Sequence, residues 1–447
     1  MADGYGLKIF YAFILLTIAL TNLRNLLNTR SGTCGSFYII SQGRIHQQWN
    51  LWNKYLPTVK PYYAVKCNSE TNILRWLGAL GSGFDCASAR EMELCRQATN
   101  TSADPYRIVF ANPCKTAQDI ETARGARIPW ATIDCSEELE KMRDRAYMPE
   151  LLLRLAVDDA ASDTPFSKKF GLDGWDEVKR LYDAATAKGF KVGGFSFHVG
   201  SGCRDFSQYQ RAINKVDAFW GKLKGLGAAG LHTVDIGGGF RAGESFFAPA
   251  ADSIKKGLAE LDAAKGANII AEPGRFFATP SHDLFVRVIG KKPALGSGSS
   301  GSSGWRYTID ESVYGQFSCI PFDGQRPPFA RITDGATTRT MAGTKVVRSE
   351  TRPVAPGIIF GRTCDSLDII CYSSVMEELE VGDWLYFPWM GAYTTVTSSE
   401  FNGFPKPHVI YSSQDVMPEV AEWPNTLADS LSWQKDIEYA LETRSRI

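Results

Sequence analysis

Short apolar runs alternate with longer amphipathic stretches between residues 61 and 273. The runs are rich in aliphatic, aromatic and β-branched residues and are bounded by polar or turn-forming residues, which is typical of buried strands. The longer stretches, such as Ser88–Gln97 and Trp175–Lys188, are rich in Glu, Lys, Ala, Leu and Arg and predict helices. The eight predicted strands are Pro61–Lys66, Gly83–Ser88, Arg107–Asn112, Trp130–Cys135, Glu150–Leu155, Gly193–His198, Thr233–Gly238 and Asn268–Pro273.

Eight strand-plus-helix units in about 210 residues predict an α/β fold of the (β/α)8 TIM-barrel type. A doubly wound parallel sheet of similar size is the alternative. The barrel is favoured by polar residues at or beside the carboxyl ends of the apolar runs, because barrel enzymes place their chemistry at that face. These residues are Lys66, Asn112, Asp134, Arg154, His198 and Glu272.

The pattern changes after about residue 280, where strand-like runs are separated by turns and prolines, and this predicts a β-rich barrel or sandwich. We expect an N-terminal segment at 1–36, a barrel domain at 37–279 that includes the strand-like Phe37–Ile40 beside its first unit, and a β-rich domain at 280–447. The runs of the second domain are Asp283–Ile289, Trp305–Ile309, Asp368–Tyr372 and Trp384–Phe387.

Two segments stand apart from this pattern. Ile9–Leu20 is apolar except for Thr17, but a spanning helix needs about 20 residues, so a non-membrane role is favoured over a signal-type segment or a short anchor. Residues 296–304 read GSGSSGSSG and satisfy G-x-G-x-x-G. Their low-complexity setting, without a strand before and a helix after, predicts a flexible loop and not a dinucleotide site.

Composition removes several classes of function. The 49 Lys and Arg balance the 49 Asp and Glu, so no global basic field favours nucleic acid as a partner. The ten Cys contain no C-x-x-C pair, which predicts reduced thiols in a cytoplasmic enzyme and neither a disulfide framework nor a zinc site. With five His and no H-x-x-x-H spacing, no metal site is expected.

Candidate chemistry gathers at the ends of four predicted strands. Lys66 follows the apolar run PYYAV. Two interpretations are open: a strand-end lysine that reaches solvent, or a desolvated amine able to form a Schiff base. Gly237–Gly239 follow another run, as either a tight turn or a backbone cradle for phosphate.

Glu272 and Arg275 flank a Pro-Gly turn, as either a surface ion pair or partners of a cofactor with a cationic ring nitrogen and a phosphate. His198 and Ser201 follow the fourth run; a lone histidine there is usually a satisfied core residue.

Ten ordered motifs resemble those of the eukaryotic-type ornithine decarboxylases, pyridoxal-phosphate enzymes of the alanine-racemase-like fold. The resemblance extends over residues 37 to 412. The motifs are PYYAVKCNS, GFDCAS, ANPCK, KFG, SFHVGSGC, DIGGGF, AEPGRFF, VYGQF, TCDSLD and GDWLYFPWMGAYT.

The resemblance implies that pyridoxal 5'-phosphate is the cofactor and that L-ornithine is decarboxylated to putrescine and CO2, the first step of polyamine biosynthesis. Lys66 would carry the cofactor, His198 would stack on its ring, and Glu272 would keep its ring nitrogen protonated. The implied phosphate-binding and further pocket residues are Asp85, Glu91, Arg154, Ser201, Gly237, Gly238, Gly239, Pro273, Gly274, Arg275 and Tyr393.

The resemblance assigns further roles to the second domain. Cys364 would protonate the substrate carbon after CO2 leaves, while Asp323 and Asp365 would bind the distal ammonium beside Tyr314 and Phe322. In the family these residues enter the partner subunit's active site, which implies a homodimer, and an antizyme-like regulator is a further expected partner.

Two departures from the family pattern concern the substrate. Phe322 stands where the family commonly has tyrosine, and Asp158–Lys169 before KFG differs from the usual stretch near the pocket mouth. A lysine, arginine or diaminopimelate decarboxylase of the same fold is one alternative. A non-catalytic protein of the antizyme-inhibitor type is another, although this chain retains the catalytic set.

Overall fold

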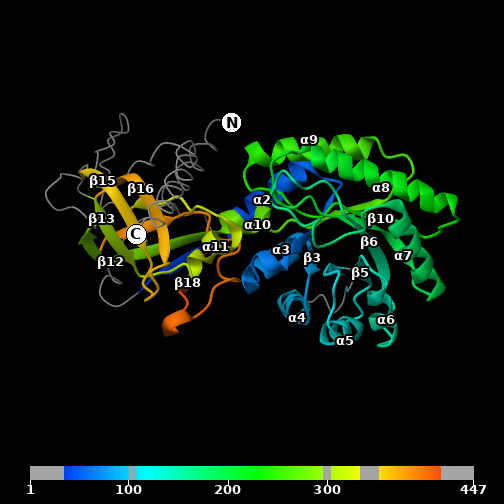
Figure 1. Cartoon of the computed structure of the whole chain (residues 1–447), viewed down its shortest axis with the longest axis horizontal. Helices are drawn as coiled ribbons and strands as arrows, with labels where there is room; N and C mark the ends of the chain where they lie inside the picture. Colours follow the sequence, from blue (N-terminus) through cyan, green and yellow to red (C-terminus); the bar gives the residue numbers. More distant parts are fainter. Residues whose placement is uncertain (1–34, 100–103, 105–106, 295–303, 333–351, 414–447) are drawn as a thin grey trace, which may run out of the picture. The chain divides into compact units, whose positions relative to one another are not determined.

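The computed structural model describes residues 35–99, 104, 107–294, 304–332 and 352–413. They form two compact units, one at Arg44–Pro280 and one built from the described residues on either side of it (Figure 1). The N-terminal run Ile9–Leu20 lies outside the described residues, as does the Gly/Ser segment up to residue 303. None of the helices in the described ranges combines the length and hydrophobicity needed to cross a bilayer.

The first unit contains a closed barrel of eight parallel strands, which confirms the predicted (β/α)8 fold. Each of the eight predicted apolar runs contributes one strand. Two strands have the predicted length of six residues, and the other six strands are one to three residues shorter. In order around the barrel the strands are β2 (Lys60–Ala64), β3 (Gly83–Cys86), β4 (Ile108–Phe110), β5 (Trp130–Ile133), β6 (Glu150–Leu155), β8 (Val192–Phe197), β10 (Thr233–Asp235) and β11 (Asn268–Ala271).

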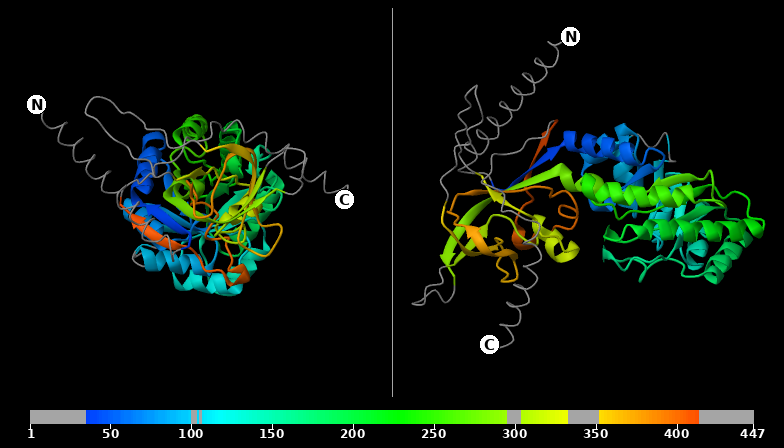
Figure 2. Two further views of the ribbon diagram at one scale, coloured as in Figure 1. Left: turned by 90° about the vertical axis from the view of Figure 1, so that its left-hand side faces the viewer. Right: turned by 90° about the horizontal axis from the view of Figure 1, so that it is seen from above.

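Helices surround this barrel (Figures 1 and 2), and their ends follow from local capping chemistry. The Glu70 carboxylate accepts the N–H groups of Asn72 and Ile73 at the start of α3, and Gly81 ends that helix with a φ of 105°. The helices are α2 (Gln42–Tyr55), α3 (Thr71–Leu80), α4 (Ala89–Ala98), α5 (Ala117–Gly125), α6 (Glu137–Arg143), α7 (Trp175–Ala187), α8 (Ser207–Gly225), α9 (Glu244–Ala259) and α10 (Arg275–Ala278).

The barrel interior is closely packed with large side chains. Tyr62, Val109, Trp130, Leu152 and Ile270 come from five different strands and form one buried cluster. Gly83 lies opposite Tyr62 in the β2–β3 pair, and a Cβ atom at Gly83 would come within 2.4 Å of the tyrosine ring. A side chain at this glycine would therefore displace the ring and disturb the strand that leads to Lys66.

The second unit is β-rich, as predicted, and its strands form one eight-stranded sheet that branches at β12. The pairs are antiparallel except for β1 with β18 and β13 with β15. The strands are β1 (Phe37–Ser41), β12 (His282–Pro293), β13 (Trp305–Ile309), β14 (Ala330–Arg331), β15 (Val354–Phe360), β16 (Ile369–Glu377), β17 (Trp384–Phe387) and β18 (His408–Ser412).

The placement of Phe37–Ile40 beside the first barrel unit is wrong. This run forms β1, which pairs with β12 and β18, and the chain enters the barrel unit only at Arg44. The physical reason is aromatic packing: the rings of Phe37 and Phe285 stack at 4.7 Å and share a buried cluster with Trp384. The apolar run gave no signal about which sheet it would join.

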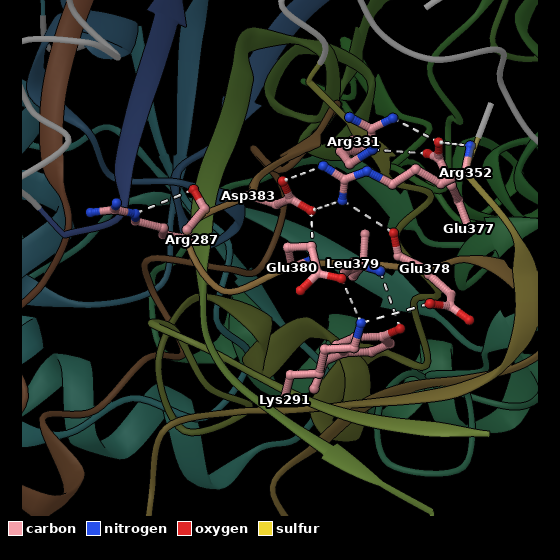
Figure 3. A network of polar contacts seen from close by, with 11 residues as sticks. Arg287, Lys291, Arg331, Arg352, Glu377, Glu378, Leu379, Glu380 and Asp383 are labelled. Atoms are coloured by element: carbon pink, nitrogen blue, oxygen red, sulfur yellow. Dashed lines mark hydrogen bonds and ion pairs between the residues drawn. The ribbon is translucent and has the colours of Figure 1, made fainter. Parts of the chain in front are cut away.

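Ion pairs fasten the outer part of this sheet (Figure 3). Arg331 on β14 forms a bidentate pair with Glu377 on β16, at 3.0 and 2.6 Å. Arg352 pairs with Asp383 in the turn before β17, and Lys291 on β12 lies 2.7 Å from Glu380. These contacts join strands that are distant in sequence.

Candidate active site

The barrel residues predicted from the sequence lie at the carboxyl ends of strands, the face where barrel enzymes carry their chemistry. Lys66 is in the 3-10 turn Val65–Cys67 that follows β2, Asp85 is on β3 and Arg154 is on β6. His198 directly follows β8, and Ser201 is on the short strand β9 (Ser201–Cys203). Gly237–Gly239 follow β10, while Glu272, Pro273 and Gly274 lie between β11 and Arg275, the first residue of α10.

Lys66 and Asp85 form the central ion pair of this face, with Nζ and Oδ2 2.8 Å apart. The pairing of β2 with β3 sets Ala64 opposite Asp85 and so brings the two side chains together. Asp85 is buried, whereas the Lys66 side chain is 39% exposed. Asp85 Oδ1 is buried and has no hydrogen-bond partner among the described residues, so a ligand donor could satisfy it.

Glu91 is held near this pair by the start of α4. Its Oε2 accepts the N–H of Ala87 at 2.6 Å, and its own N–H donates to the Ser88 cap at 3.4 Å. Burial, reinforced by the charge of Asp85, raises the pKa of the Glu91 carboxyl to about 7.

Two further carboxyl groups, Asp235 and Glu272, are buried side by side at the ends of β10 and β11. Burial raises the pKa of Asp235 to about 7, and burial together with the charge of Asp235 raises the pKa of Glu272 well above its usual value. Arg154 and Lys66 oppose part of this shift in Glu272. Burial also lowers the pKa of Arg154, whose guanidinium lies 4.8 Å from the centre of the Phe170 ring.

The glycine turn after β10 has a backbone path that side chains could not follow. Gly237 and Gly239 have φ values of 64° and 98°, in the left-handed region. A Cβ atom at Gly237 would lie 2.1 Å from the Phe197 carbonyl oxygen, and one at Gly239 would lie 2.5 Å from that of Gly200. The turn therefore brings bare backbone against the loop after β8, as a phosphate-binding turn requires.

Arg275 and Ser201 add side-chain donors beside this turn. An Nη atom of Arg275 donates to Ser201 Oγ at 2.9 Å. The Pro273 carbonyl accepts the N–H of Ala64 at 3.2 Å, and a Cβ atom at Gly274 would come within 2.9 Å of Cys67. The AEPGR turn is thus packed against the strand that leads to Lys66, and its arginine carries a permanent positive charge suited to an anion.

His198 is buried and uncharged. Its Nδ1 accepts the N–H of Gly200 at 3.0 Å, so the ring proton is on Nε2. Burial lowers the pKa of the imidazole well below its usual value, and the charges of Lys66 and Arg154 lower it further. A neutral, fixed imidazole presents a flat face that can stack on an aromatic ligand.

This set of residues fits pyridoxal phosphate. A lysine amine is available for the aldehyde, a glycine turn with Arg275 and Ser201 for the phosphate, and the buried Glu272 carboxyl for a ring nitrogen. The orphaned oxygen of Asp85 offers a further polar contact.

The second unit gathers the remaining predicted residues into two groups. In the first, the Tyr314 hydroxyl donates to Asp365 Oδ2, and the N–H of Leu367 donates to Asp365 Oδ1 at 3.0 Å. The hydrogen bonds from Leu367 and Tyr314 lower the pKa of Asp365. The bond with Asp365 in turn raises the pKa of the Tyr314 hydroxyl. Cys364 is exposed next to them, and its N–H donates to Asn402.

The second group lies at the end of the helix α11 (Cys319–Asp323). The Gln325 amide donates both to Asp323 Oδ2 and, at 2.9 Å, to the carbonyl oxygen of Ala392. It thereby ties Asp323 to the segment that contains Tyr393, a half-buried residue with a φ of 55°. Phe322 is 73% exposed, so the residue that replaces the family's tyrosine contributes little to this unit's own core.

Three residues of the barrel mouth were given no role from the sequence. Asp235 could have been found, since it closes an apolar strand directly before the glycine turn. Phe170 belongs to the KFG motif, but its contact with Arg154 needed the fold. Tyr209 is on α8, and its hydroxyl donates to the Gly238 carbonyl at 2.9 Å; its position in a helix gave no signal.

The chain matches one family model over more than half its length. Residues 42–279 match the pyridoxal-binding domain of the pyridoxal-dependent decarboxylases. This range contains the complete barrel and every barrel-mouth residue described above. The match agrees with the fit of pyridoxal phosphate to the site.

Individual relatives extend the likeness into the second unit. A probable ornithine decarboxylase from Dictyostelium discoideum is 38% identical over 385 residues, covering 84% of this chain and 79% of that protein. An ornithine decarboxylase from Caenorhabditis elegans is 36% identical over 392 residues, covering 86% and 89%. The crystal structure of the Paramecium bursaria Chlorella virus arginine decarboxylase is 32% identical with a TM-score of 0.78, covering 88% of this chain and 100% of that one.

Proposed function

The chain belongs to the pyridoxal-dependent decarboxylases, and from this premise we propose that it converts L-ornithine to putrescine and CO2. The observation that carries the proposal is the buried Glu272 carboxyl in the mouth that holds Lys66, within a chain 36–38% identical to ornithine decarboxylases over most of its length. Bound there, the cofactor withdraws electrons from the substrate's α-carbon so that CO2 can leave.

The barrel residues have distinct tasks in this proposal. Lys66 binds the cofactor covalently through its Nζ atom, and Glu272 supplies a proton to the ring nitrogen, a task consistent with its raised pKa. Arg275, Ser201 and the glycine turn bind the phosphate, with Tyr393 as a further hydroxyl. His198 stacks on the ring as a neutral imidazole.

The residues of the second unit recognise the substrate and complete the reaction. Asp323 and Asp365 bind the distal ammonium, since two carboxylates suit one small cation. The lowered pKa of Asp365 keeps it ionised for this purpose. The exposed thiol of Cys364 donates a proton to the substrate carbon after CO2 leaves.

We propose that the active form is a homodimer in which these residues enter the partner subunit's barrel mouth. The exposure of Cys364 and of Phe322 supports this, because residues with roles in binding and proton transfer need a surrounding that excludes water. A two-fold dimer would make both composite sites equivalent.

A cytoplasmic location is also part of the proposal. None of the nine cysteines within the described ranges forms a disulfide. Cys86 and Cys95 are both buried with their sulfur atoms 3.8 Å apart, and they form a hydrogen bond and not a disulfide. Reduced thiols at this distance suit a reducing compartment.

Arginine is the second candidate substrate. The match with the arginine decarboxylase structure covers the whole of that protein and 88% of this chain. In addition, Phe322 stands in the distal part of the proposed pocket where the family commonly has tyrosine. The test is CO2 release from ornithine, lysine and arginine, measured side by side with purified protein and pyridoxal phosphate. We expect ornithine to have the highest kcat/KM; a preference for arginine or lysine would overturn the substrate assignment. Absence of both CO2 release and yellow absorbance would identify a non-catalytic relative.

A further inference from the structure

The connection between β6 and α7 is folded back on itself at the barrel mouth. The Asp159 carboxylate, which is buried, accepts the backbone N–H groups of Phe166 and Ser167 at 2.5 and 2.8 Å. The N–H of Ser162 also donates to the Asp159 carbonyl at 3.1 Å. One carboxylate thus closes the segment 159–167, which we call the strap.

The strap is fastened to the loop that contains His198 and Ser201. Its strand β7 (Ser162–Thr164) pairs antiparallel with β9, with Thr164 opposite Ser201. The Ser162 hydroxyl donates to the Val199 carbonyl, one residue after His198. At Gly200, with a φ of 83°, a Cβ atom would lie 2.6 Å from the Ser162 side chain. The two segments therefore pack with no space between them.

A pair of arginines also holds the strap at its outer side. Arg204, just after β9, and Arg241, after the glycine turn, both contact the Asp163 carboxylate. The Arg241 pair measures 2.9 Å. The strap is consequently joined both to the loop after β8, which leads to Ser201, and to the segment after the glycine turn that follows β10, and both Ser201 and the glycine turn are proposed to bind phosphate.

Closing the strap brings the Phe166 ring against His198. The ring centroids are 4.7 Å apart and the planes are inclined by 55°. Two backbone segments also approach the imidazole: the Gly200 N–H donates to Nδ1, and Gly238 runs so close to Nε2 that a Cβ atom added there would come within 2.8 Å of it. Of these contacts, only the one with Phe166 is made by a side chain.

We propose that Phe166 is a positioning residue that fixes the orientation of the His198 imidazole for the cofactor ring, and that Asp159 acts through it by closing the strap. A tilted aromatic contact at this distance restrains a neutral imidazole without charging it. The inference rests on the proposed function of the barrel mouth as a pyridoxal phosphate site, but not on which amino acid is decarboxylated.

The test compares Phe166→Ala, Phe166→Tyr and Asp159→Asn with the wild type. Each holoenzyme is diluted, the bound cofactor is followed by its visible absorbance to obtain Kd, and visible-region circular dichroism reports the cofactor's surroundings. We expect Phe166→Ala to raise Kd by roughly three- to tenfold, as expected for loss of one aromatic contact, and to change the dichroism. Phe166→Tyr, which retains the ring, should restore both, and Asp159→Asn should resemble Phe166→Ala.

Two matched variants separate positioning from general stability. Asp217 likewise accepts backbone N–H groups, from Asp262 and Ala264, and Phe219 packs on Trp175 at 5.8 Å; both lie among the outer helices and the loop before β11. Asp217→Asn and Phe219→Ala should lower thermal stability but leave Kd and dichroism unchanged. Wild-type cofactor binding in Phe166→Ala would overturn the proposal, as would an equal loss in the two control variants. A wild type that binds pyridoxal phosphate but does not act on ornithine would refute only the substrate assignment.

Discussion

The barrel mouth and the predicted residues of the β-rich unit carry similar chemical groups in opposite surroundings. In the barrel mouth, burial raises the pKa of Glu91, Asp235 and Glu272. In the β-rich unit, hydrogen bonds lower the pKa of Asp365. The barrel mouth thus holds buried carboxyl groups whose ionisation is unfavourable and which a bound cofactor can stabilise. The β-rich unit, in contrast, offers an ionised carboxylate at its surface.

This contrast separates two tasks. Groups that tune a cofactor need burial, because a low dielectric strengthens electrostatic interactions between charges and shifts the pKa of each group. Groups that select a soluble cationic substrate need charge at neutral pH, which exposure preserves. We infer that the barrel governs the reaction type and the β-rich unit governs the choice of substrate.

Lys66→Ala removes the amine on which the barrel half of this contrast depends, and the largest effect is expected here. The yellow absorbance and turnover should both be lost, while the fold is retained because the side chain is 39% exposed and leaves no large cavity. Lys54→Ala removes the lysine of another ion pair, with Glu244 on the outer surface, and should leave both readouts unchanged. Normal turnover in Lys66→Ala would overturn the cofactor assignment.

Asp365→Ala and Asp323→Ala test the β-rich half. Each removes one partner of the substrate's distal ammonium, at a cost of about 2–4 kcal/mol of binding. The KM for ornithine should rise by tens to hundreds of times, and the cofactor absorbance should stay the same. Asp383→Ala, which removes a carboxylate of the network in Figure 3, is the control and should leave KM unchanged. Unaltered ornithine kinetics in Asp365→Ala would show that the substrate pocket lies elsewhere.

Glu91→Gln sharpens the contrast through pH. Below its usual pKa of 4.5, the Glu91 carboxyl is protonated in both the folded and the unfolded state and costs no stability. As the pH rises toward its folded pKa of about 7, the unfolded state ionises first and the folded apoprotein loses stability. The variant should therefore unfold at higher urea concentration than the wild type at pH 8, by up to about 3 kcal/mol, but not at pH 4.

Asp365→Asn is the comparison for this pH measurement. Its carboxyl has a lowered pKa, so ionisation favours the folded state above the usual pKa and the variant should gain no stability at pH 8. A Glu91→Gln apoprotein whose stability follows the wild type at both pH values would contradict the buried charge assigned to the mouth.

The sequence predicted most of this arrangement, because the barrel rests on a repeated pattern. All eight apolar runs became barrel strands, and Lys66, His198 and Glu272 follow their strands as expected. The stretch that contains the strap was expected near the pocket mouth, but its closed conformation was not predicted. Its central contacts join Asp159 to backbone N–H groups and Phe166 to His198, and such contacts depend on how a loop closes.

Phe37–Ser41 illustrates a different limit. The run was correctly predicted as a strand, but its partner was determined by the stacking of Phe37 on Phe285, about 250 residues away in sequence. An apolar run indicates that a strand will be buried, but it does not indicate which sheet the strand will join. The roles of Cys364 and Asp365 rest on the family resemblance, since their exposed surroundings alone indicate no active site.

Mixing two variants, each inactive at an ornithine concentration far below the raised KM of Asp365→Ala, tests most directly whether the two regions meet across a dimer. Lys66→Ala and Asp365→Ala are combined in equal amounts and allowed to exchange subunits, with exchange verified independently by tagged chains. Random pairing makes half the dimers hybrid, and each hybrid has one site with both lesions and one with neither. Activity should recover to about one quarter of the wild type by this symmetry. If each site were built within one chain, every site would carry a lesion, and a mixture that stays inactive after exchange would contradict the shared site.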